Sequence, residues 1–168
     1  EGSVNVSRFG GRIVGPGGFI NISQNARCVV FCGSFTAGKT EIAWPGGKTL
    51  IGRDGRHHKL VPKVEQITYS GRYGRERRQK VLYLTERAVF RLGESGLELI
   101  EIAPGIDLER DIMARMGFTP AISPQLESMD ERLFLPAPMG LAAHIAKRPL
   151  RAPSPHLRLL DTAKMAAQ

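Results

Sequence analysis

The chain has 168 residues, of which 42% are hydrophobic and 24% charged, an ordinary composition for a soluble globular protein. No apolar run approaches the roughly 20 residues of a membrane helix, and no signal peptide is visible, so we expect a cytoplasmic protein without a membrane partner. The formal net charge of +8 favours polyanionic partners, such as nucleic acid, acidic lipid or a phosphorylated ligand. Because the chain does not begin with Met, we expect it to be a fragment of a longer protein.

The first part of the chain is predicted to contain short strands separated by glycine-containing turns. Residues 15–19 form a glycine loop, residues 20–26 an amide-rich segment, and residues 70–79 a polar loop. The last three of the expected strands follow one another as a β-meander. Strands are expected over residues 4–9, 28–32, 40–44, 49–51, 60–67, 80–87, 88–92 and 97–102.

Both cysteines of the chain, Cys28 and Cys32, fall in one of these strands. On the same face of a strand they are about 13 Å apart, which is too far for a disulfide. The spacing of the histidines completes no metal site with them. We therefore expect buried thiols in a reducing compartment and no bound metal.

One clear helix is predicted, from Asp107 to Met116. Asp107 is a suitable N-cap, and Glu109 and Asp111 favour the positive end of a helix. Gly117 is expected to end the helix as a C′ residue. An apolar stripe on one face is expected to join the core, and it consists of Leu108, Ile112 and Met116.

The stretch GSFTAGKT, residues 33–40, matches the Walker A pattern of nucleotide-binding loops at every position. A working loop of this kind must leave a strand and open a helix, whose N-terminus holds the phosphates. Only four residues separate Thr40 from the turn at Pro45, which is too few for a helix. We therefore expect a strand after Thr40 and no ATP site.

Three stretches together resemble the C-terminal part of a family I CoA-transferase, from Val4 to about Gly140. They are GPGGFINISQNARCVVFCGSFTAG (residues 15–38), VEQITYSG (64–71) and VLYLTERAVFRLGESGLELIEIAPGIDLERDIMARMGF (81–118). The resemblance implies an α/β fold, an open sheet flanked by helices. Residues 1–140 would belong to this domain, and residues 141–168 would be a loosely ordered Pro/Ala/Arg-rich tail with one short helix near residues 141–147.

The resemblance also implies a reaction: CoA moves between a short-chain acyl-CoA and acetate or a related carboxylate, as in short-chain fatty acid and ketone body metabolism. A glutamate carboxylate would attack the thioester and later carry CoA as a glutamyl-CoA thioester. The family's glutamate lies about sixty residues before the G-x-G-G-F element, so it is expected upstream of Glu1, and the chain alone is expected to be inactive. Coenzyme A would be a substrate, with no permanently bound cofactor. The other partners would be small carboxylates, the remainder of the CoA-transferase chain and further copies in a homo-oligomer.

By the same resemblance, the backbone N–H groups of Gly17 and Gly18 would contact the thioester carbonyl or oxyanion, since glycine lets a backbone approach a ligand closely. Phe19 would shape the acyl or pantetheine slot. The residues expected to complete the CoA and substrate site are Gly15, Asn21, Gln24 and Asn25. A plain tight turn is the competing interpretation of the glycines.

Two other functions are compatible with the sequence. The polar loop from Arg72 to Lys80 places Tyr73 among arginines, a mixture that suits phosphate contact and base stacking in a nucleic-acid-binding module. No known nucleic-acid-binding motif accompanies it, so we expect a solvated loop. The chain could instead be a purely structural piece of an oligomer.

Overall fold

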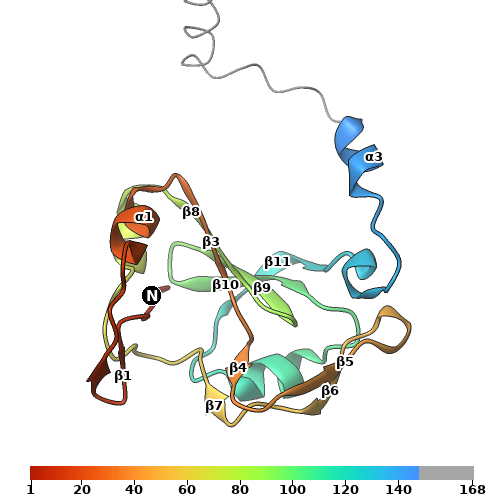
Figure 1. Ribbon diagram of the computed structural model, residues 1–168, viewed down its shortest axis with the longest axis horizontal. Coiled ribbons are helices and arrows are strands. Elements are labelled where there is room, and N and C mark those ends of the chain that lie inside the picture. The colour runs from red at the N-terminus through yellow and green to blue at the C-terminus, as the bar shows by residue number, and fades with distance from the viewer. Residues whose placement is uncertain (148–168) are drawn as a thin grey trace, which may run out of the picture. The chain divides into compact units, whose positions relative to one another are not determined.

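The computed structural model describes residues 1–147 and divides the chain into two units, Glu1–Pro136 and Ala137–Gln168 (Figure 1). In the second unit, helix α3 (Leu141–Ala146) is found where a short helix was predicted. The rest of the predicted tail lies outside the described residues. No helix within residues 1–147 is long and apolar enough to cross a membrane.

A mixed five-stranded sheet forms the centre of the first unit (Figure 1). Strands β8 (Lys80–Leu84), β9 (Ala88–Leu92) and β10 (Leu97–Ile102) are joined by short turns into the predicted antiparallel meander. Two outer strands run parallel to their neighbours: β3 (Cys28–Cys32) beside β8, and β11 (Ala121–Ser128) beside β10. The sheet is thus the predicted open α/β type.

Smaller elements surround this sheet. Three two-stranded sheets pair β1 (Arg8–Phe9) with β2 (Arg12–Ile13), β4 (Thr36–Ala37) with β7 (His57–His58), and β5 (Glu41–Ala43) with β6 (Leu50–Arg53). The helical segments are α1 (Phe19–Asn25), α2 (Gly71–Glu76), and the single turns Pro45–Gly47, Leu108–Ile112, Met113–Arg115 and Glu131–Phe134.

Aromatic rings fill the main core, which lies on one face of the sheet. The Phe31 ring on β3 lies 5.0 Å from the Tyr69 ring and 5.5 Å from the Tyr83 ring, measured between centroids. Ile112 and Met116 close this core from the predicted helical segment, and Leu108 packs against it, so the expected apolar stripe is confirmed. Burial of such side chains is the main source of stability for the unit.

The helix predicted from Asp107 to Met116 begins where expected but winds differently. The Asp107 carboxylate caps it by accepting a hydrogen bond from the Arg110 backbone N–H at 2.7 Å. The chain then forms a π-helical turn, Leu108–Ile112, followed by a 3-10 turn. Gly117 is not a left-handed C′ residue; it is needed because a Cβ there would lie 2.7 Å from Pro62 Cδ.

Two segments for which no helix was predicted are short helices. The amide-rich segment forms helix α1, in which the Ser23 hydroxyl donates to the Phe19 carbonyl at 2.7 Å. Helix α2 replaces the polar loop, with Ser70 as its N-cap. Its glycines permit close packing: a Cβ on Gly74 would lie 2.0 Å from Tyr69 Oη. Glycine here serves packing and not a turn.

The remaining strand predictions were wrong at two places, and four strands were missed. Residues 60–67 form no strand, since Pro62 interrupts them and the Leu60 carbonyl bonds instead to the Gly117 N–H. Only a two-residue strand and an isolated bridge between Val4 and Tyr69 replace the first predicted strand. Strand β11 and the two-residue strands β2, β4 and β7 were not predicted.

The cysteines lie on the outer face of β3, and both are exposed and free. The expectation of buried thiols was therefore wrong, because no segment within residues 1–147 covers the face of β3 that carries Cys28 and Cys32.

Candidate functional site

The glycine loop, residues 15–18, joins β2 to α1 and lies on the surface. Gly15, Gly17 and Gly18 are all exposed, and Gly17 has a φ of 55°, in the left-handed region that favours glycine. No group within residues 1–147 accepts a hydrogen bond from the backbone N–H of Gly17 or Gly18. These two N–H groups are therefore available to a ligand.

Packing within the described chain does not explain why the other positions of this loop are glycine. A Cβ on Gly15 would have no neighbour within 4 Å, and its φ lies outside the left-handed region. Gly18 has an ordinary φ of −79°, and its Cβ would meet only the end of the Ile22 side chain, at 3.3 Å. A requirement from outside the chain, such as close approach of a ligand to the backbone, would account for glycine at both positions.

The other predicted site residues lie on α1 but face different surroundings. Phe19 is half-buried and packs on the Phe31 ring with a centroid distance of 5.8 Å, so it anchors α1 to the sheet. Gln24 faces α2, where its Oε1 accepts a hydrogen bond from the Ser70 N–H at 2.9 Å. Asn21 and Asn25 are exposed, and the Asn25 amide donates to the Asn21 carbonyl at 2.8 Å.

The contact between Phe19 and Phe31 also fixes where the glycine loop lies relative to the sheet. Phe31 belongs to the carboxyl-terminal half of β3, and β3 runs parallel to β8. In open α/β sheets, ligands bind beyond the carboxyl ends of parallel strands. The start of α1 therefore packs against the part of β3 that leads to the edge where such sheets place their ligands.

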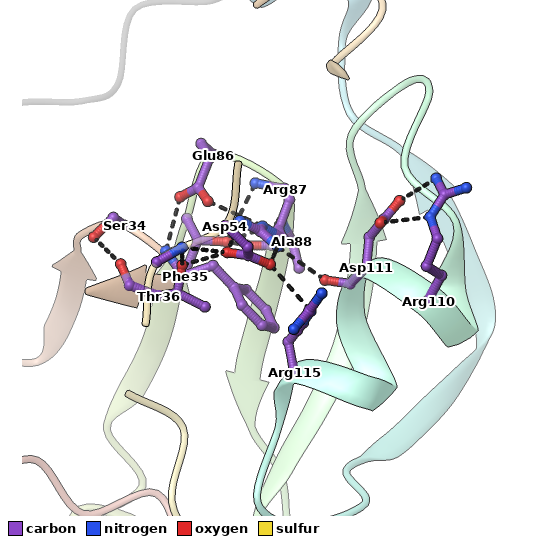
Figure 2. Close-up of polar contacts among 12 residues, drawn as sticks. Ser34, Phe35, Thr36, Asp54, Glu86, Arg87, Ala88, Arg110, Asp111 and Arg115 are labelled. Carbon is purple, nitrogen blue, oxygen red and sulfur yellow. Dashed lines mark hydrogen bonds and ion pairs between the residues drawn. The ribbon is translucent and has the colours of Figure 1, made fainter. Parts of the chain in front are cut away.

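A buried charged network lies beyond the same carboxyl ends, where β3 continues to Ser34 and β8 to Glu86 (Figure 2). The Arg87 side chain is fully buried and forms a bidentate pair with Asp54, at 3.0 and 3.1 Å. Its Nε donates to Glu86 at 3.0 Å, and Arg115 approaches Asp54 to 3.2 Å. One arginine thus joins segments that are far apart in the sequence.

The network holds the loop that follows β3. The Phe35 N–H donates to Glu86 Oε2 at 2.8 Å, and the Thr36 hydroxyl donates to Asp54 Oδ1 (Figure 2). The Arg87 guanidinium also lies over the Phe35 ring, 4.8 Å from its centroid, a cation–π contact. Contacts from the side chains of Glu86, Asp54 and Arg87 therefore hold the loop at the carboxyl end of β3.

Charge pairing keeps the carboxylates of this region ionised. Burial by itself would raise the pKa of Asp54, but hydrogen bonds from Arg87 and Thr36 and the Arg87 charge outweigh it, so the pKa lies below its ordinary value. The hydrogen bonds from Arg110 lower the pKa of Asp111 against the opposing effect of burial. Neither carboxylate is adapted to take up a proton at neutral pH.

The sequence analysis did not identify this network. Arg87 belongs to the turn TERA between two apolar strands, and a charged residue in that position is normally solvated. The sequence signal nearest to the network is the Asp54-Gly55 pair, which predicts a turn. In the structure the Gly55 N–H bonds to both Thr36 Oγ1 and Asp54. Nothing local in the sequence pairs Asp54 with Arg87, which lies 33 residues away.

The Walker A match is not a phosphate-binding loop. The segment leaves β3 as expected, but the chain enters strand β5 after Thr40 and no helix follows Lys39. Among residues 1–147, no group of three or more His, Cys, Asp or Glu side chains is placed to hold a metal ion.

The basic segment around α2 presents arginines on a helix and not on the predicted loop. Arg72 pairs with Glu76 at 3.8 Å, and the Arg77 guanidinium lies 5.6 Å from the centroid of the Tyr73 ring. A base that stacked on this face of Tyr73 would have to displace Arg77.

Comparison with known proteins identifies relatives that match most of the chain. No protein-family model matches the sequence. The acetate CoA-transferase YdiF of Escherichia coli O157:H7 is 53% identical over 150 residues, covering 86% of this chain and 28% of its own length. The caffeate CoA-transferase of Acetobacterium woodii is 52% identical over 138 residues, covering 79% of this chain and 26% of its own length.

A solved structure agrees with these relatives. The crystal structure of the acyl-CoA transferase YdiF from E. coli O157:H7, as a thioester complex with CoA, has a TM-score of 0.80 at 51% identity. The match covers 82% of this chain and 27% of the crystallised chain. The chain is homologous to part of a CoA-transferase, and the predicted resemblance is confirmed. It spans a little over a quarter of the length of the relatives that it matches.

Proposed function

We propose that this chain is part of a cytoplasmic CoA-transferase that exchanges CoA between a short-chain acyl-CoA and acetate or a related carboxylate. The observation that carries the proposal is the 53% sequence identity with the acetate CoA-transferase YdiF over 86% of the chain. The reaction would pass through a glutamyl-CoA thioester, and the nucleophilic glutamate would come from outside these residues.

In this proposal the glycine loop stabilises developing charge. Attack of a carboxylate on a thioester moves negative charge onto the carbonyl oxygen, and backbone N–H groups aimed at that oxygen lower the barrier. The N–H groups of Gly17 and Gly18 have no acceptor in the described chain, and the space beside Gly17 is open. Gly15 would leave room for the ligand, and Asn21 and Asn25 would line its approach from α1.

Coenzyme A would be a substrate here and not a resident cofactor. The homologous YdiF was crystallised as a thioester complex with CoA, which supports a CoA thioester as the ligand of the same fold. The small carboxylate acceptor, the remainder of the CoA-transferase chain and further copies in a homo-oligomer would be the other partners.

The glycine loop can be tested in a chimera, in which residues 1–136 of this chain replace the homologous segment of the E. coli O157:H7 YdiF enzyme. Gly18→Pro removes the N–H, and we expect turnover to fall about 10²–10³-fold. Gly18→Ala keeps the N–H, and its Cβ meets only the mobile end of Ile22, so we expect a much smaller loss. Circular dichroism would establish that both variants fold.

A folded Gly18→Pro chimera that exchanges CoA between acetyl-CoA and propionate at nearly the normal rate would contradict the role of Gly18. A separate measurement concerns the 168-residue chain by itself, for which we expect no exchange because its nucleophile is absent. Exchange by the pure isolated chain would show that the glutamate lies within these residues.

A further inference from the structure

Strand β3 has the composition of an interior strand although it lies at an edge of the described sheet. Its sequence, CVVFC, contains no charge, proline or glycine. Strands that are apolar on both faces are typical of sheets in which neighbours and cover surround them. Yet β3 has β8 as its sole neighbour within residues 1–147, and Val30 on its outer face is 48% exposed.

The hydrogen bonds at the two ends of β3 show which backbone groups remain unpaired. The Arg27 carbonyl accepts from the Lys80 N–H at 3.0 Å, and the Gly33 N–H donates to the Leu84 carbonyl at 3.0 Å. Backbone groups alternate in direction along a strand, so the odd-numbered residues face β8. The N–H and C=O groups of Cys28, Val30 and Cys32 therefore face the open edge.

The opposite edge of the sheet, strand β11, is protected against pairing with a further strand, whereas β3 is not. Strand β11 carries Pro124 and Glu127 among polar residues, and proline and charge are the devices that keep edge strands from adding another strand. Strand β3 has neither. An unprotected apolar edge of this kind is a surface for strand addition.

We infer that the open edge of β3 pairs with a β-strand supplied by the part of the CoA-transferase polypeptide outside these 168 residues. This partner rests on the proposed function, since the relatives devote about 72% of their length to sequence that the chain does not match. The chain matches only 27% of the solved relative's chain, which favours a partner from the same polypeptide over a second copy. The added strand would hydrogen-bond the backbone N–H and C=O groups of Cys28, Val30 and Cys32.

Hydrogen exchange in the isolated chain and in the chimera with YdiF tests this pairing without any substrate. In the isolated chain we expect the amides of Cys28, Val30 and Cys32 to exchange quickly, and those of Val29 and Phe31 to be protected by β8. In the chimera we expect the three edge amides to exchange at least about tenfold more slowly.

A pair of proline variants separates the two sides of the strand. Val30→Pro removes an N–H that faces the open edge, so the isolated chain should keep its circular dichroism spectrum, while the chimera should lose protection at Cys28 and Cys32. Val29→Pro removes an N–H that faces β8 and should unfold the isolated chain. If Val30→Pro also unfolds the isolated chain, the wild-type exchange rates decide the question.

Two results would overturn the inference. Equal, fast exchange of the three edge amides in both proteins would show that the edge stays open. Protection in the isolated chain that rises with protein concentration, together with dimers in sedimentation, would assign the edge to a second copy. Because exchange is measured without CoA, a chimera that protects β3 but lacks transferase activity would refute the proposed function alone.

Discussion

Replacing Arg87 by alanine removes the guanidinium that links four segments of the first unit. Its side chain is fully buried and donates to Asp54, Glu86 and the Asp111 carbonyl. Alanine would leave two carboxylates in a largely dry environment with fewer donors. The loop that carries Phe35 would also lose the cation over its ring.

The expected loss of stability follows from the partners that stay behind. Breaking a buried ion pair by removing one member costs about 3–5 kcal/mol, because the remaining charge is uncompensated. Asp54 retains Arg115 at 3.2 Å and its hydrogen bond from Thr36, which favours the lower end of that range. We therefore expect the free energy of unfolding to fall by about 3 kcal/mol, and Tm by about 6–12 °C.

Urea unfolding followed by far-UV circular dichroism measures this change. Arg91→Ala is the matched control, because Arg91 also makes a bidentate pair, with Glu98, but is half exposed. Exposed pairs contribute little to stability, so this variant should remain close to the wild type. If Arg87→Ala lowers the free energy of unfolding by less than about 1 kcal/mol, and by no more than Arg91→Ala does, the buried network does not stabilise the fold as its geometry indicates.

Three further predictions concern pH and ligands. The pKa values of Asp54 and Asp111 are lower in the folded chain than in the unfolded one. The stability that these two carboxylates contribute should therefore be complete above about pH 5 and decline as pH falls below about 4. A urea midpoint unchanged between about pH 6 and 2 would contradict this. Isothermal titration with Mg-ATP should show no binding, since no helix follows Lys39, and micromolar binding abolished by Lys39→Ala would refute this. Gel-shift titrations should show no tight nucleic-acid binding by the basic α2 segment; sub-micromolar, steeply salt-dependent binding that is lost when its arginines become serine would favour the nucleic-acid alternative. The four arginines to replace are Arg72, Arg75, Arg77 and Arg78.

The sequence by itself determined the elements whose causes are local. Strands β3, β9 and β10 have the predicted bounds, because runs of β-branched and aromatic residues end at glycine-containing turns or polar residues. The helical segment begins at Asp107 because its own carboxylate caps the chain. The resemblance to CoA-transferases rests on such local stretches, and it was confirmed as well.

Tertiary structure alone decided the elements whose stability comes from distant partners. Strand β11 contains proline and polar residues and becomes a strand because it pairs with β10. Helix α2 forms from a glycine- and arginine-rich segment because Gly74 lets it pack against Tyr69, and Gly71 lets it pack against the backbone of Gly2. Arg87 is buried because Asp54, 33 residues earlier, compensates its charge. The open edge of β3 belongs to the same class, since a strand's neighbours are set by the sheet and not by its own residues.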